Sequence, residues 1–247
     1  MNESIKTLLR TVQTTVPALQ PVKESWQARW RDVAKRPHEC DFRALVHLDR
    51  RPGVVLDVGA NIGQSVQSVR LFWPEVDIWA FEPNPGLADI LERRFNGSIS
   101  VFPVALGSRP GKFSLYVPSY NGWVFHGLAS LDRDEAASWL RHRVLRFRES
   151  KLELSEVEVE VRSLDEVTAS IEVGLVKLDT QGTEVDILDG GHALLDRCRP
   201  ALIVESGLFE GRMAEVLRPL GYQPFVFVRG ALQPGDRGGL NTFFIAR

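Results

Sequence analysis

Apolar residues along the chain follow two spacings in turn, and their order predicts repeated strand–turn–helix units. Residues 54–59 form a short, β-branched apolar run, which is typical of a strand buried on both faces. After two glycines, apolar residues return at helical intervals, so we expect a helix over about 62–73. A strand, a glycine turn and a helix in this order make the first unit of a nucleotide-binding α/β fold.

The same pattern continues to the end of the chain. Further strands are expected at 77–81, 99–104, 173–178, 201–204, 225–228 and 242–246. Helices are expected between several of them, at about 87–95, 185–195 and 213–220. The last two strands read as an antiparallel edge. We therefore predict an α/β fold built on a doubly wound, mostly parallel sheet of seven strands.

Two segments interrupt this pattern. Residues 1–50 have helical character broken by Pro17 and Pro21, and we read them as an N-terminal helical extension whose role as a lid, an oligomerisation arm or a cap stays open. Residues 51–247 form the main domain, and about 110–165 read as an insertion between its third and fourth strands. Long insertions in compact domains tend to be functional, so we expect an acceptor pocket there.

Composition narrows the class of protein. The 247 residues carry a net charge of −2 without a long basic run, which disfavours nucleic acid as the main partner. No apolar run approaches the ~20 residues that span a bilayer, and no signal-peptide core is present, so we expect a cytoplasmic protein. Cys40 and Cys198 lie far apart and read as free thiols. His38, Cys40 and His47 lack a fourth metal ligand at finger spacing.

The first glycine turn carries an acid whose position bears on the ligand. Asp57 ends the first strand and precedes Gly59, Asn61 and Gly63 in a D-x-G-x-N-x-G pattern. An acid there would repel the pyrophosphate of a dinucleotide but would suit an ammonium group. The glycines would let the backbone approach a ligand closely. A plainer interpretation makes Asp57 a helix cap or a partner of loop N–H groups.

A second acid ends the next strand. Glu82 lies 25 positions after Asp57, about the offset at which such folds present a carboxylate to ribose hydroxyls. A ligand with a ribose, an amino-acid moiety and no pyrophosphate points to S-adenosylmethionine. Two acids in this order around a glycine-rich turn are better explained by such a cofactor site than by two unrelated loop residues.

These segments, together with a third, resemble a known family. The segments Asp57–Gly63, Glu82–Pro85 and Lys177–Glu184, in this order and spacing, are similar to those of FkbM-family S-adenosylmethionine-dependent methyltransferases. The resemblance covers about residues 52–246 and implies a class I, Rossmann-like methyltransferase fold. It also implies O-methylation of a sugar, glycolipid or other small biosynthetic product, so the expected partner is a small-molecule or glycan acceptor. Gln181 stands where the family usually has an acid.

The expected cofactor contacts lie at the ends of the first three strands. They are Asp57, Gly59, Asn61, Gly63, Glu82, Pro83 and Ala105. Ala105 belongs to the turn Ala105–Ser108, which in this kind of fold would lie beside the adenine.

Methyl transfer to a hydroxyl requires a group that takes up the proton. Asp179 follows the fourth strand and leads into a glycine turn, so it is the preferred base; His126, in the insertion, is the main alternative. Asp179 and Glu205 end adjacent strands and form an alternative site for one Mg²⁺ or Ca²⁺. His192 is a weaker candidate for the base, because it lies within an expected helix.

Other functions stay open at this level. A cofactor-binding protein that no longer catalyses, or a scaffold in a biosynthetic complex, would keep the same motifs. A nicotinamide-dependent oxidoreductase would keep the fold. A homo-oligomer is compatible with all of them.

Overall fold

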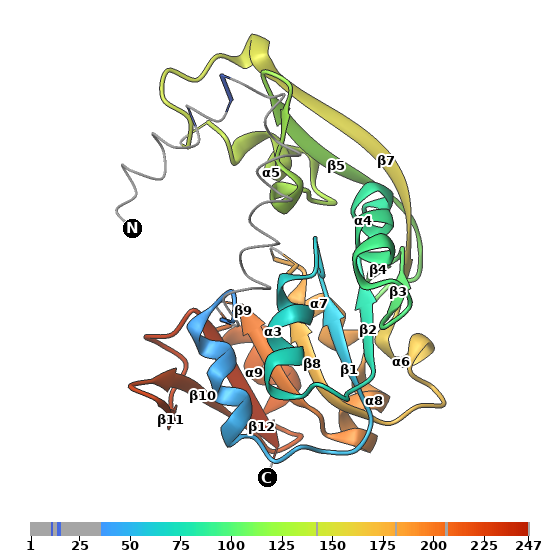
Figure 1. Ribbon diagram of the computed structural model, residues 1–247, viewed down its shortest axis with the longest axis vertical. Coiled ribbons are helices and arrows are strands. Elements are labelled where there is room, and N and C mark those ends of the chain that lie inside the picture. Colours follow the sequence, from blue (N-terminus) through green and yellow to red (C-terminus); the bar gives the residue numbers. More distant parts are fainter. Residues whose placement is uncertain are drawn as a thin grey trace. The chain divides into compact units, whose positions relative to one another are not determined.

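The computed structural model describes residues 11, 14–15, 36–141, 143–180, 182–205 and 207–246. Within these residues, eight strands form one sheet in the order β11-β10-β12-β9-β8-β1-β2-β3 (Figure 1). The strands of this sheet are β1 (Val54–Val58), β2 (Ile78–Phe81), β3 (Ser100–Phe102), β8 (Val173–Leu178), β9 (Ala201–Glu205), β10 (Tyr222–Val228), β11 (Ala231–Pro234) and β12 (Asn241–Ala246). β3, β2, β1, β8 and β9 are parallel, whereas β12, β10 and β11 are antiparallel.

The predicted mostly parallel sheet with an antiparallel edge is confirmed, but its strand number was wrong. The described chain adds β11 to the seven predicted strands. A turn with Arg229 and Gly230, both at positive φ, joins β10 to β11 as a two-residue hairpin. β11 has only four residues, most of them exposed, so it lacks the apolar run that marks a buried strand.

Helices cover both faces of this sheet, because the strands bury apolar residues on both sides. The apolar side chains of the strands form two clusters. The cluster on one face packs with α3 (Gln64–Phe72), α4 (Pro85–Phe95) and the 3₁₀ helix η2 (Cys40–His47). The cluster on the other face packs with α7 (Glu184–Asp189), α8 (His192–Cys198) and α9 (Gly211–Leu217). Successive side chains of a strand belong alternately to the two clusters, as Val55 and Leu56 do in β1. The doubly wound arrangement is therefore confirmed.

One predicted helix is divided in two. The expected helix over 185–195 is interrupted at Gly190 and Gly191, between α7 and α8. A side chain at Gly190 would overlap the backbone carbonyl of Gly107, so the chain approaches another segment closely there. The carbonyl of Gly190 also accepts a hydrogen bond of 2.9 Å from the N–H of Asp165 in α6 (Leu164–Val167).

The chain divides into two compact units. The larger unit contains residues 35–111 and 160–247, and the smaller one contains 1–34 and 112–159. This division differs from the predicted boundary at residue 50, because η2 packs on α3, β10 and β11 in the larger unit. Most of the predicted extension lies outside the described residues.

The smaller unit is built on two long strands. β5 (Gly111–Tyr120) begins in the larger unit and pairs with β6 (Trp123–Val124), and β7 (Leu152–Arg162) runs back into the larger unit, where it pairs with β4 (Ala105–Leu106). The remaining elements are η3 (His126–Leu128), α5 (Arg133–Ser138) and η4 (Glu149–Lys151). Asp132 caps the N-terminus of α5, where its side chain accepts hydrogen bonds from the N–H groups of Asp134 and Glu135.

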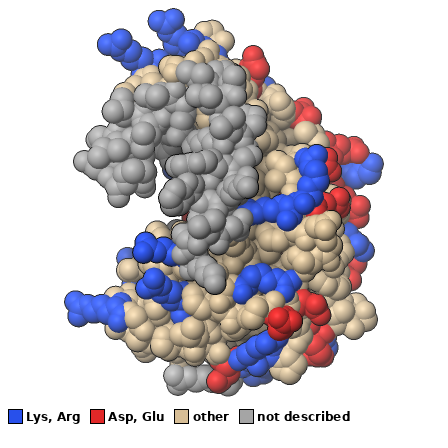
Figure 2. Space-filling view, in the orientation of Figure 1, with Lys and Arg blue, Asp and Glu red and all other residues tan. Residues whose placement is uncertain are grey.

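Surface features agree with the composition. Both cysteines are free thiols, as predicted. No helix in the described part of the chain combines the length and the apolar character that crossing a membrane requires. On the face shown in Figure 2, both basic and acidic residues occur, in keeping with the small net charge.

Candidate active site

The candidate site lies in the larger unit, where the strand order reverses. From β1 the chain continues to β2 and β3 on one side, and it later returns to β8 and β9 on the other side. Open α/β sheets bind ligands at the carboxyl ends of strands at this switch point. Backbone hydrogen bonds join the three central strand ends: the N–H of Gly59 donates to Phe81, and the N–H of Asp179 donates to Val58.

A buried lysine at this edge connects two acids. Asp57 in β1 and Lys177 in β8 are register partners on neighbouring parallel strands, so their side chains leave the sheet on the same face. Lys177 Nζ lies 3.2 Å from Asp57 Oδ1 and 3.4 Å from Asp179 Oδ2, and it donates a 3.1 Å hydrogen bond to the carbonyl of Gly59. The three charged groups therefore form an acid–lysine–acid cluster.

The charges of this cluster compensate one another inside the protein. Burial opposes the charge on Lys177, but the nearby carboxylates of Asp57 and Asp179 outweigh it and raise the pKa of Lys177 above its ordinary value. Lys177 is thus a fixed cation and cannot act as a proton acceptor. Asp57 is only 1% exposed; its Oδ2 accepts a hydrogen bond from the Ser65 hydroxyl.

The cluster changes the argument made for Asp57. We expected Asp57 to repel a pyrophosphate on the assumption that its carboxylate has no cationic partner. In the structure, Lys177 neutralises Asp57. Among the described residues, Asp57 Oδ1 has the ion pair but no hydrogen-bond donor. Sequence reasoning missed Lys177, although a lysine within the apolar run Val173–Leu178 was a signal, since a buried lysine needs a charged partner.

Glu82 is held by the loops on either side of it. Its Oε2 accepts a 2.8 Å hydrogen bond from the N–H of Asn61, and its Oε1 accepts a 2.9 Å bond from the N–H of Asn84. Burial raises the pKa of Glu82 to about 7, although the two backbone hydrogen bonds and Lys177 oppose the shift. Each carboxylate oxygen keeps one further lone pair, so the group has room for two more donors.

The two glycines are required mainly by the protein itself. Gly59 has a φ of 76°, and a Cβ there would overlap the backbone oxygen of Asp179. Gly63 has a φ of 82°, and a Cβ there would overlap the ring of Phe95. We expected these glycines to allow close approach of a ligand, whereas in the structure they allow contacts with Asp179, directly after β8, and with Phe95 in α4. Asn61, also at positive φ (51°), is stabilised in this conformation by its bond to Glu82.

Pro83 and Ala105 occupy different surroundings. Pro83 is half-buried in the loop between β2 and α4. Ala105 is buried and lies in β4, where it pairs with Val161 in β7. The expected turn after the third strand is therefore replaced at its first two residues by a short parallel strand.

Asp179 directly follows β8 and Glu205 is the last residue of the neighbouring strand β9, so both lie at strand ends, as expected. Leu178 and Val204 are register partners in β8 and β9, so Asp179 and Glu205 leave the sheet at the same edge. The carboxylate of Asp179 is 32% exposed and can meet a ligand. Within the described residues, no group of three or more His, Cys, Asp or Glu side chains could hold a metal ion, so the Mg²⁺ or Ca²⁺ alternative gains no support.

The loop after Asp179 is stabilised by an acid of its own. Glu184 accepts hydrogen bonds from the N–H groups of Thr180 and Gly182, and from the Thr180 hydroxyl. Gln181, which departs from the family pattern, lies outside the described residues. The hydrogen bonds to Glu184 connect Thr180 and Gly182 to the first residue of α7.

The two histidines are not part of this cluster. His126 is half-buried at the start of η3 in the smaller unit, whereas Asp179 belongs to the larger unit. His192 is exposed at the start of α8. Within the larger unit, the structure brings together Asp57, Glu82 and Asp179, and Lys177 joins them.

Sequence comparison identifies the family of this domain. A model of the methyltransferase FkbM domain matches residues 57–227, which is more than half of the chain. The chain belongs to the FkbM methyltransferase family. The match begins at Asp57 and includes Glu82, Lys177 and Asp179, so it spans the whole candidate site.

Relatives of the FkbM domain include proteins of different length. The 2-O-methyltransferase NoeI of Sinorhizobium fredii is 27% identical over 169 residues, covering 64% of this chain and 65% of NoeI. The AMB antimetabolite synthetase AmbE of Pseudomonas aeruginosa is 26% identical over 214 residues, which cover 74% of this chain but 10% of AmbE. The chain thus spans just under two thirds of one curated relative and a tenth of the other.

A solved structure supports the fold. The crystal structure of methyltransferase FkbM from Methylobacillus flagellatus superposes with a TM-score of 0.51 at 16% identity, covering 83% of this chain and 48% of that one. The FkbM domain described here therefore has the α/β fold that the sequence predicted.

Proposed function

We propose that this chain is an S-adenosylmethionine-dependent O-methyltransferase. The observation that carries the proposal is Glu82, a buried carboxylate at the carboxyl end of β2 with two lone pairs left after its bonds to Asn61 and Asn84. Two accepting oxygens on one carboxylate match the two hydroxyls of a ribose. Family membership adds that the group to be bound belongs to methyl transfer.

The residues at the switch point fit this cofactor. Glu82 would hold the ribose, and the loop from Gly59 to Gly63 would lie against the amino-acid moiety, with Pro83 and Ala105 on the side of the nucleoside. Asp57 acts on this loop indirectly, because its carboxylate is engaged by Lys177 and Ser65. When bound, the cofactor supplies a methyl group activated by a positively charged sulfur.

Asp179 is the residue assigned to the proton of the acceptor. Its partly exposed carboxylate would accept the hydrogen of the acceptor hydroxyl, and Lys177 would hold that carboxylate in position. Lys177 touches Asp179 rather than the substrate, so it is a positioning residue. His126 remains a second proposal for the base.

The acceptor is proposed to be a hydroxyl of a sugar, glycolipid or other small biosynthetic product. The name of the relative NoeI, a 2-O-methyltransferase, supports oxygen as the methylated atom. The position that is methylated depends on the contacts that the acceptor makes. Methyl-transfer assays with candidate acceptors test the substrate class.

Calorimetry tests the cofactor. The full chain is titrated with S-adenosylhomocysteine and, separately, with NAD. Heat of binding with S-adenosylhomocysteine alone is the expected result. Binding of NAD alone would replace the proposal with a nicotinamide-dependent oxidoreductase, and no binding of either would remove it.

Substitution of Asp179 tests the chemical step. Asp179→Asn keeps the size of the side chain but removes a proton acceptor, so turnover on a methyl-accepting sugar should fall by about 10²- to 10⁴-fold. The affinity for S-adenosylhomocysteine should change little, and His126→Gln provides the comparison. Loss of turnover in His126→Gln with full activity in Asp179→Asn would move the role to the histidine. A wild-type chain that binds the cofactor without methylating any acceptor would favour the non-catalytic alternative.

A further inference from the structure

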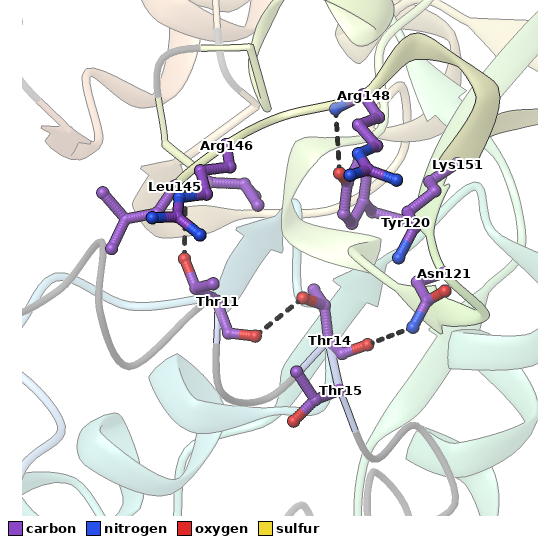
Figure 3. Close-up of a pocket in the computed structure, with 10 residues that line it drawn as sticks. Thr11, Thr14, Thr15, Tyr120, Asn121, Leu145, Arg146, Arg148 and Lys151 are labelled. Carbon is purple, nitrogen blue, oxygen red and sulfur yellow. Dashed lines mark hydrogen bonds between the residues drawn. The ribbon is translucent and has the colours of Figure 1, made fainter.

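The smaller unit contains a cavity that the proposed function does not use. Its volume is about 270 Å³, close to nine times the ~30 Å³ that one water occupies in the liquid. Figure 3 shows Arg146, Arg148 and Lys151 along one side and Thr11, Thr14 and Thr15 along the other. The space is sufficient for a small polar group such as a phosphate with part of a sugar ring.

The cavity has a strong excess of positive charge. Arg146, Arg148 and Lys151 all line it, and none of its described lining residues is acidic. Within the described chain, none of these three side chains forms an ion pair with a carboxylate. The nearest acid in the sequence, Glu149, is paired with Arg141 at 2.9 Å. Like charges around one cavity repel each other, and a bound anion would remove that repulsion.

Other basic residues of the same unit show what ordinary pairing looks like. Lys112 in β5 lies 2.7 Å from Glu158 in β7, and Arg141 pairs with Glu149. Among the residues that the structure describes, the three cavity residues have no such acid, and neither does the exposed Arg133 of the same unit; what distinguishes the three is that they line one cavity together, which is the pattern expected where a ligand provides the negative charge. Arginine in particular matches the oxygens of a phosphate with two parallel hydrogen bonds.

Hydrogen bonds fix the walls of the cavity in place. The N–H of Leu145 donates to the Thr11 hydroxyl at 2.9 Å, and the side-chain amide of Asn121 donates to the carbonyl of Thr14 at 2.6 Å (Figure 3). The N–H of Arg148 donates to the Tyr120 hydroxyl at 2.9 Å. Thr14 and Tyr120 are both buried, so these bonds belong to the interior of the unit.

The loop that carries the arginines adopts an unusual backbone conformation. Arg146 has a φ of 53°, in the left-handed region that a residue with a Cβ rarely adopts. Asn121 is also at positive φ, but it precedes Gly122 in the hairpin turn between β5 and β6, where such values are expected. Arg146 also lies in a turn, so its conformation shapes the loop that carries the arginines but does not by itself indicate a ligand.

We propose that this cavity binds the phosphate group of a small polar ligand. Arg146, Arg148 and Lys151 provide the positive charge, and Asn121 and the threonines provide polar groups for the hydroxyls of an attached sugar. The proposal concerns the smaller unit alone and does not depend on methyl transfer in the larger one. A phosphate of this kind is carried either by a free sugar phosphate or by a phosphorylated lipid.

Titration calorimetry at constant ionic strength tests the site, with glucose 1-phosphate as the probe and glucose as the neutral comparison. The double variant Arg146→Gln, Arg148→Gln removes two charges without changing the backbone bond from Arg148 to Tyr120. The matched control is Lys112→Gln, Arg141→Gln, which removes two charges of the same unit that already have acidic partners. Circular dichroism and thermal melting establish that both variants fold.

Glucose 1-phosphate should bind at least tenfold more tightly than glucose to the wild-type chain. The cavity variant should lose at least tenfold in affinity, and the control should stay within about twofold of wild type. If glucose 1-phosphate binds, equal losses in both variants, or binding of glucose with the same affinity, would overturn the proposal; if it does not bind, the vesicle experiment below decides. If the double variant does not fold, Lys151→Gln is measured instead, with an expected loss of several-fold against Lys112→Gln.

A second arm separates the two sources of phosphate. Sedimentation is measured with vesicles of phosphatidylcholine containing phosphatidic acid. Binding that depends on the cavity residues in this arm, but is absent with glucose 1-phosphate, supports the site with a lipid as its ligand. No cavity-dependent binding in either arm overturns it.

Discussion

The two units handle charge in opposite ways. In the larger unit, Lys177 lies buried between Asp57 and Asp179, and each charge of this cluster has a partner from the protein. In the smaller unit, Arg146, Arg148 and Lys151 are exposed around a cavity without acidic lining residues in the described chain. A buried charge loses its hydration when the protein folds and needs a partner from the protein. An exposed charge stays hydrated until a ligand of opposite charge binds. The first arrangement therefore positions groups, and the second selects what binds.

Removing the buried cation should have the largest effect on stability. Lys177→Met leaves the size of the side chain nearly unchanged but removes the cation that pairs with the carboxylates of Asp57 and Asp179. The free energy of unfolding should therefore fall by about 3–5 kcal/mol. Lys112→Met, which breaks an exposed ion pair with Glu158, should cost less than about 1 kcal/mol. Urea denaturation measures both, and similar losses would contradict the contrast between the two units.

A smaller effect is expected from the first glycine. Gly59→Ala places a methyl group against the carbonyl oxygen of Asp179, at a positive φ, and should lower the free energy of unfolding by about 3 kcal/mol. Gly97→Ala is the control: its φ is also positive (80°), but nothing lies within 4 Å of the added atom, so about 1 kcal/mol is expected. Equal costs would mean that the approach of β1 to β8 is looser than described.

The smallest of these effects concerns Glu82 and pH. Its pKa of about 7 means that part of the carboxyl is protonated near neutral pH. If Glu82 accepts two ribose hydroxyls, the affinity for S-adenosylhomocysteine should fall about tenfold per pH unit below 7 and level off above 8. Calorimetry from pH 5.5 to 8.5 measures this, and a flat profile would remove Glu82 from the ribose site.

The same group has an opposite effect on the free protein. Because burial raises the pKa of Glu82 above its usual 4.5, the folded state favours the protonated form. Its contribution to stability is present below about pH 4.5 and is lost as the pH rises to 7. S-adenosylhomocysteine should therefore raise the melting temperature more at pH 8 than at pH 6.

Much of the fold could be predicted from local patterns. The apolar runs gave the seven strands they mark, and β-branched residues at 173–178 predicted β8 with its bounds. The divided helix and β11 could not be predicted in this way. Gly190 interrupts the helix because Gly107 lies against it, and β11 is a strand only because β10 offers it an unpaired edge.

The candidate site was predictable in part. Asp57, Glu82 and Asp179 were found because acids that follow apolar strands must lie at the same sheet edge. Lys177 was missed as a functional residue, since nothing local reveals that it faces two acids from different segments. The cavity was missed because Thr11, Thr14 and Thr15, which line it opposite the loop 146–151, lie far from that loop in the sequence.

The sequence by itself determined the alternation of strands and helices and the acids at the strand ends, because burial and chain direction act over a few neighbouring residues. Only the tertiary structure decided which charges meet. Register places Lys177 beside Asp57. Folding brings Thr11, Thr14 and Asn121 against the loop that carries three cations, which closes a cavity around them. Electrostatic interactions depend on distance in space rather than along the chain, so the chemistry of both sites was set when the fold brought these residues together.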